Sequence, residues 1–133
     1  MERTFARGLD SLDAIFGYLS ERIEALELDP GSGFAVNMAV EELFTNMVKY
    51  NRSGTGGISI AVSGQPDGVE IRMVDFDSEP FDITSMAEVD TSAPLEARRP
   101  GGLGIHLVRC LMDEVQYEYK SRRTSIRLFK NRP

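Results

Sequence analysis

A carboxylate and a carboxamide stand four residues apart, at Glu42 and Asn46, in a segment whose apolar residues follow helical spacing. In a helix this spacing places both side chains on one face, one turn apart. The Asn46 amide oxygen suits Mg²⁺, which prefers oxygen donors and retains several waters. The Glu42 carboxylate can orient or deprotonate a nucleophile. The alternative is a pair that only solvates an amphipathic helix. The apolar residues that mark the core side of this helix are Phe34, Met38, Leu43 and Met47.

A second carboxylate ends a predicted strand. Val69, Ile71, Met73 and Asp75 alternate along it and therefore share one face. Because the first three are apolar, Asp75 continues a row that is expected to face inward, where a carboxylate needs a partner. The amino group of a ligand, such as the exocyclic amine of adenine, would serve. The alternative is an aspartate that caps the following turn.

A glycine cluster, Gly101-Gly102-Leu103-Gly104, leads directly into an apolar helical pattern. Glycine lets the backbone approach a ligand closely, and the first turn of a helix offers unpaired N–H groups at the positive end of its dipole. This arrangement predicts a phosphate site, and a tight turn is the alternative. Arg98 and Arg99 stand just before it, where guanidinium groups either clamp a phosphate or remain solvated. His106 is expected on the helix surface or in its packing.

Periodicity predicts the elements that position these side chains. The expected helices cover 10–28, 34–50 and the stretch after Gly101, and the expected strands cover 1–7, 57–62, 69–75, 116–120 and 124–130. Residues 29–33 are expected to form a turn, and the last hairpin is expected to have a solvated tip at Arg122-Arg123. A segment without periodicity, about 77–100, is expected to be a lid, because long loops in compact domains are usually functional or disordered. This order predicts an α/β (α+β) two-layer sandwich, a mainly antiparallel sheet with helices on one face.

Length and charge limit the classes of function. A chain of 133 residues fits one domain, 1–133. The net charge of −6 argues against a general nucleic-acid binder but allows a local site for a small phosphorylated ligand. The single cysteine, Cys110, excludes an internal disulfide and is expected to be a small core residue. No apolar run approaches the ~20 residues of a membrane span and no signal-peptide pattern is present, so a cytoplasmic protein is expected.

Together, the order and spacing of these motifs resemble the ATP-binding domain of the GHKL (Bergerat-fold) superfamily. Its members include anti-sigma-factor serine kinases, histidine kinases, gyrase-type ATPases and Hsp90-type chaperones. The resemblance implies ATP and Mg²⁺ as ligands, Glu42 as the catalytic base or orienting group, and Asn46 as the Mg²⁺ ligand. It also implies that Asp75 binds adenine with Thr124 in support, and that the glycine cluster holds phosphates. The implied nucleotide site consists of Asn46, Asp75, Arg99, Gly101, Gly102, Leu103, Gly104, Ile105 and Thr124.

Within that superfamily, the size of the chain and its motifs look like the anti-sigma-factor serine/threonine kinases. Pro80-Phe81-Asp82, shortly after the aspartate, resembles that branch as well. Such proteins bind a sigma factor and phosphorylate a small antagonist protein, an anti-anti-sigma factor, on Ser or Thr. The resemblance therefore implies these two proteins as partners, without direct contact to nucleic acid or membrane. Relatives often form homodimers, and residues 1–30 offer a surface for a partner.

One position departs from the pattern of that branch. Asp77 replaces a glycine that usually stands two residues after the aspartate, and an alignment on Pro80-Phe81 would put Phe76 at the aspartate position. The alternation of side chains along the strand favours Asp75 as the residue at the aspartate position. The added carboxylate of Asp77 is expected to weaken ATP binding by charge repulsion. Two other functions stay open: a nucleotide-sensing switch that regulates a partner by binding alone, and a metabolic ATPase, which the lack of a separate substrate domain disfavours.

Overall fold

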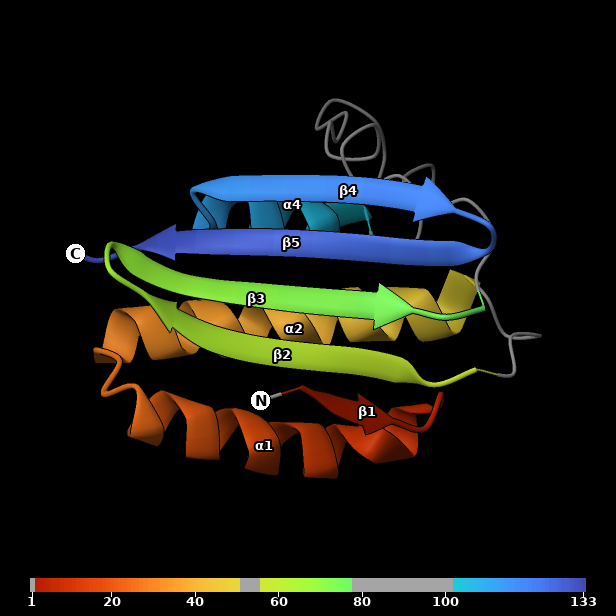
Figure 1. The fold of residues 1–133 in the computed structure, drawn as a ribbon, viewed down its shortest axis with the longest axis horizontal. Helices are drawn as coiled ribbons and strands as arrows, with labels where there is room; N and C mark the ends of the chain where they lie inside the picture. Colours follow the sequence, from red (N-terminus) through yellow and green to blue (C-terminus); the bar gives the residue numbers. More distant parts are fainter. Residues whose placement is uncertain (1, 51–55, 78–101) are drawn as a thin grey trace.

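The computed structural model describes residues 2–50, 56–77 and 102–133. It is a five-stranded antiparallel sheet in the order β1-β2-β3-β5-β4, with three helices behind one of its faces (Figure 1). The helices are α1 (Leu12–Ala25), which follows a short 3-10 turn (Leu9–Ser11), α2 (Pro30–Tyr50) and α4 (Gly102–Leu111). The strands are β1 (Arg3–Phe5), β2 (Ile58–Gln65), β3 (Gly68–Asp75), β4 (Glu114–Lys120) and β5 (Arg123–Asn131). The predicted two-layer α/β sandwich is confirmed.

Helix α2 begins four residues earlier than the apolar pattern indicates. The Ser32 backbone N–H donates to Asp29 Oδ2 at 3.0 Å, so the Asp29 side chain caps the first turn. Hydrogen bonds from Ser32 also lower the pKa of Asp29. Pro30 follows at the first helical position, where a missing N–H costs nothing. The prediction of a turn over 29–33 was therefore wrong, because a capping aspartate and a helix-initiating proline produce the same local pattern.

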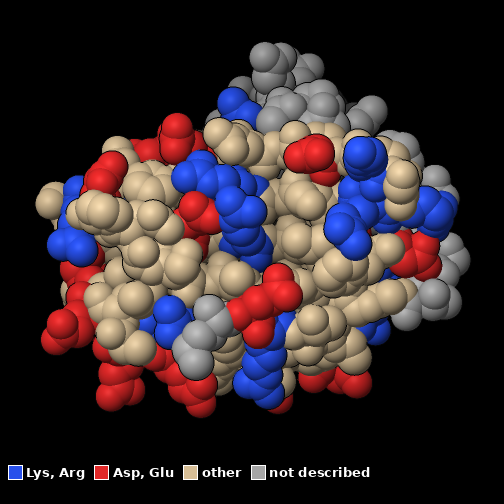
Figure 2. Space-filling model, in the orientation of Figure 1, with Lys and Arg blue, Asp and Glu red and all other residues tan. Residues whose placement is uncertain are grey.

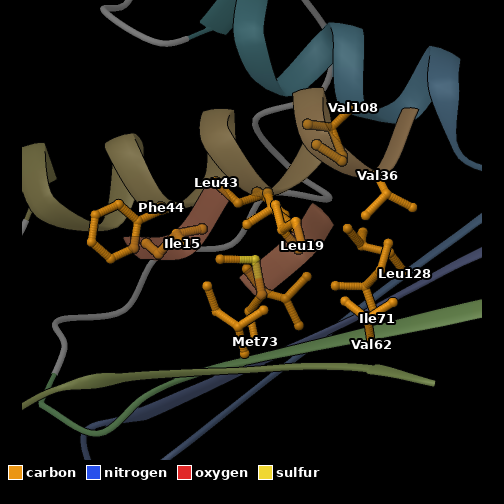
Figure 3. Packing of buried hydrophobic residues seen from close by; sticks show 14 of the residues in the cluster. Ile15, Leu19, Val36, Leu43, Phe44, Val62, Ile71, Met73, Val108 and Leu128 are labelled. Atoms are coloured by element: carbon orange, nitrogen blue, oxygen red, sulfur yellow. The ribbon is translucent and has the colours of Figure 1, made fainter. Parts of the chain in front are cut away.

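The core lies between the sheet and the helices (Figure 3). Apolar side chains from α1 and α2 meet those of the inner sheet face, and α4 adds Val108. Two expectations of burial were wrong: Phe34 is 59% exposed and Cys110 is exposed. Each stands two residues from a fully buried valine, Val36 on α2 and Val108 on α4. Two residues turn a helix by about 200°, so both side chains face away from the sheet.

One row of residues crosses the sheet near the end where β3 terminates. Asp75 pairs with Ile58 on β2 and with Thr124 on β5, and Ile58 in turn pairs with Phe5 on β1. The C-terminal end of α2 and the β4–β5 turn lie at this same end of the sheet (Figure 1). Residues from both halves of the chain therefore converge there. No helix in the described parts of the chain is both long and apolar enough to cross a membrane.

Candidate functional site

Helix α2 buries the carboxamide predicted to bind a metal. Asn46 is 1% exposed, and its Nδ2 has no hydrogen-bond partner among the described residues. Glu42, one turn earlier, is half-buried. A buried polar group without a partner costs about 1–3 kcal/mol, and such groups in native structures usually have a functional explanation. The Asn46 Nδ2 is therefore suited to a ligand that accepts its hydrogen bond.

The aspartate at the end of β3 faces the core, as strand parity predicts. Asp75 is 1% exposed, whereas the next residue, Phe76, is 41% exposed. The sheet register also places buried Thr124 directly beside Asp75. The alignment that would put Phe76 at the aspartate position does not fit this arrangement.

An arginine that the sequence analysis did not single out contacts Asp75. The guanidinium of Arg7 spans both carboxylate oxygens, with Nη1 3.1 Å from Oδ2 and Nη2 bonded to Oδ1. The two side chains are 7% and 1% exposed. Arg7 also donates to the carbonyl oxygens of Met47, Gly56 and Asp77 at 3.5, 3.2 and 3.3 Å. The protein thus provides Asp75 with its own counter-charge. The one local signal for this contact is that Arg7 stands two residues after the inward-facing Phe5.

Asp77, which replaces the usual glycine, also has a counter-charge. Its Oδ1 lies 2.8 Å from Nη2 of Arg122, and its backbone N–H donates to Asp75 Oδ1 at 3.1 Å. The guanidinium of Arg123 lies 5.0 Å from the centroid of the Phe76 ring. The expected solvated hairpin tip at Arg122-Arg123 is confirmed, because both residues are exposed at the β4–β5 turn, and the two side chains also make these contacts. Because Arg122 partly neutralises Asp77, the expected repulsion of a nucleotide is weaker than the sequence indicates.

Basic side chains gather around this turn on the sheet face that points away from the described helices, at the right of Figure 2. The residues concerned are Lys120, Arg122 and Arg123. Elsewhere that face carries acidic and basic side chains together, including the Glu70 carboxylate between Arg72 and Arg127. A local positive region thus exists at one end of an acidic protein.

The glycine-rich part of the predicted site is described only in part. Helix α4 begins at Gly102, so its N-terminus lies where the glycine pattern predicts it. The side chains of residues 101–106 lie outside the described residues, and these include Leu103, Ile105 and His106. Arg98, Arg99 and Gly101 lie outside them altogether, as does nearly all of the predicted lid. The predicted roles of these residues stay predictions.

Two further observations bear on the site. The described residues contain no cluster of three or more His, Cys, Asp or Glu side chains that could hold a metal ion. A cavity of about 550 Å³ lies instead at the opposite end of the sheet, beside the β2–β3 turn, and contains none of the predicted site residues.

Comparison with known proteins identifies the family. Residues 5–130 match the model of the histidine kinase-like ATPase domain. The chain belongs to this family. The resemblance to the GHKL superfamily, inferred from the motifs, is thereby confirmed.

Among curated proteins, the chain is 35% identical over 92 residues to the serine-protein kinase RsbW of Halalkalibacterium halodurans, a match that covers 65% of this chain and 55% of the relative. The chain spans about half the length of the curated relatives it matches.

Solved structures share the fold at low sequence identity. A chain of the SiaB–SiaC complex from Pseudomonas aeruginosa has a TM-score of 0.69 at 15% identity, with 97% of this chain and 88% of that chain covered. The RsbU and RsbW domains of a Mycobacterium tuberculosis protein give a TM-score of 0.66 at 14% identity, with 100% of this chain and 33% of that chain covered.

Proposed function

We propose that this protein is an ATP- and Mg²⁺-dependent serine/threonine kinase that acts as an anti-sigma factor. It would bind a sigma factor in the cytoplasm and phosphorylate an anti-anti-sigma antagonist on Ser or Thr. The observation that carries the proposal is the buried Asn46, one turn after Glu42 on α2, whose amide Nδ2 has no hydrogen-bond partner among the described residues. The similarity to proteins named serine-protein kinase RsbW supports the choice of reaction.

The nucleotide would lie along the end of the sheet where β3 terminates. The Asp75 carboxylate would accept a hydrogen bond from the exocyclic amine of adenine, with Thr124 beside it. The phosphates would lie at Gly101–Gly104 and the first turn of α4, where unpaired N–H groups and the helix dipole favour anions. Arg99 would add a bidentate contact to phosphate oxygens.

Transfer would depend mainly on positioning and charge neutralisation. Glu42 would orient the Ser or Thr hydroxyl of the antagonist and accept its proton as the oxygen bonds to the terminal phosphorus of ATP, while the bond from that phosphorus to the bridging oxygen breaks and ADP leaves. Asn46 would hold Mg²⁺, which neutralises negative charge on the phosphates. Its burial supports this role, because a side chain packed in the core presents its amide in a fixed direction.

A second function is favoured by Asp77, which stands where the kinase pattern has glycine. In that case the protein would be a nucleotide-dependent switch that regulates its partner by binding alone. Glu42 favours the kinase, because binding alone has no need of a base.

Incubation with ATP labelled on the γ-phosphate, together with the small antagonist encoded nearest to this protein, separates the two functions. The kinase predicts label on a Ser or Thr of the antagonist, lost in Glu42→Gln. Complex formation that depends on ATP, without label transfer, would establish the switch instead.

A further inference from the structure

The contacts of Arg7 use its whole hydrogen-bonding capacity. A guanidinium has five N–H donors. Nε donates to Gly56 O, Nη1 to Met47 O and Asp75 Oδ2, and Nη2 to Asp75 Oδ1 and Asp77 O. Every donor therefore has an acceptor within the protein. Arg7 has none left for a ligand, so any effect that it has on ligand binding must act through its neighbours.

Asp75, by contrast, keeps one acceptor position. A carboxylate offers about four lone-pair sites. Among the described residues, Arg7 fills one site on each oxygen, and the Asp77 N–H fills a second site on Oδ1. The remaining site is on Oδ2. With its three bonds in place, the carboxylate cannot rotate without breaking them, so this last site has a fixed direction.

We propose that Arg7 is a positioning residue for base selectivity, which holds Asp75 so that its one remaining acceptor meets the exocyclic amine of a 6-aminopurine. This inference rests on the proposed nucleotide function. Arg7 comes from the segment after β1 and reaches α2, Gly56 and the end of β3, so it also fixes the backbone around the base. Loss of the guanidinium would free the carboxylate to rotate and would weaken discrimination between bases with and without the amine.

The test compares ATP with the triphosphate of purine riboside, which lacks only the 6-amino group. Kd values for both nucleotides give a selectivity ratio, which a general loss of stability does not change. The ratio is measured for the wild type, Arg7→Gln and Arg7→Lys, below the melting temperature of each. Arg22→Gln is the matched control, because Arg22 is also partly buried and donates to a backbone carbonyl, Val62 O at 2.9 Å.

We expect the wild type to prefer ATP. In Arg7→Gln the selectivity ratio should be about tenfold smaller, which is the scale of one hydrogen bond to a charged group. Arg7→Lys, which keeps the charge but cannot span both oxygens, should retain an intermediate ratio, and Arg22→Gln the full one. In an Asp75→Asn background, Arg7→Lys should leave the ratio unchanged. The comparison of Arg7→Lys with and without Asp75→Asn still tests the inference if Arg7→Gln does not fold.

Two results would overturn the inference in different ways. A wild-type preference for ATP that survives unchanged in the Arg7 variants would remove the role of Arg7 and leave the proposed function intact. A wild type that binds neither nucleotide, or both equally, would remove the proposed base site itself.

Discussion

The buried pair between Arg7 and Asp75 makes a quantitative prediction about stability. Arg7→Met keeps much of the side-chain volume but leaves the Asp75 carboxylate buried without a counter-charge. Removal of one member of a buried ion pair costs about 3–5 kcal/mol. With an unfolding entropy of about 2.1 cal/mol/K per residue, a chain of 133 residues should lose about 11–18 °C in melting temperature.

Thermal unfolding followed by circular dichroism at pH 7 measures this loss. The double variant Arg7→Met/Asp75→Leu should regain at least half of it, because an apolar replacement of the whole pair removes the unpaired charge. Arg122→Met is the control: its pair with Asp77 is largely exposed, so it should cost about 0–1 kcal/mol. A melting temperature for Arg7→Met within the range of that control, or a double variant less stable than both single variants, would refute the reasoning.

Two other predictions concern ligand and pH. Saturating Mg²⁺-ATP should raise the melting temperature by mass action, with about 2.7 kcal/mol of stabilisation at a hundredfold excess over Kd. Asp75→Asn should remove most of this shift. A wild-type melting temperature that ATP leaves unchanged would argue against the nucleotide site. The hydrogen bond from Arg72, followed by that from Arg127, lowers the pKa of Glu70 in the folded protein. Its contribution to stability is therefore present above the ordinary glutamate pKa and is lost as pH falls through the folded value. Urea titrations between pH 7 and 3 should accordingly show that the free energy of unfolding falls less on acidification in Glu70→Gln than in the wild type. An equal fall in the two proteins would contradict this.

Local patterns were enough to predict most of the fold. The alternation of Val69, Ile71, Met73 and Asp75 fixed the inward face of β3 because strand parity is a property of neighbouring residues. The apolar spacing of α1 is local in the same sense. Where local chemistry has two outcomes, prediction failed: Asp29-Pro30 either turns the chain or starts a helix, and here it starts α2.

The partner of Asp75 could not be read from the sequence. Parity indicates that the carboxylate is buried, and burial demands a partner, but neither says which residue supplies it. Arg7 lies 68 residues away in the chain and reaches Asp75 only because β1 adds to the sheet beside β2. The pairing of Asp77 with Arg122, 45 residues away, is equally non-local. Both contacts follow from the assembled sheet, whereas the Glu42–Asn46 spacing is a property of one helix.

In the proposed kinase, Glu42 performs the chemistry and Asn46 serves binding. Phosphotransfer to the antagonist and ATP affinity, measured in parallel for Glu42→Gln and Asn46→Ala, test this division most directly. Glu42→Gln should keep ATP affinity within a few-fold and slow transfer by about 10²–10⁴, the scale of a positioned acid–base group. Asn46→Ala should weaken Mg²⁺-dependent ATP binding itself. Transfer at the wild-type rate by Glu42→Gln would contradict the role of Glu42 as the base.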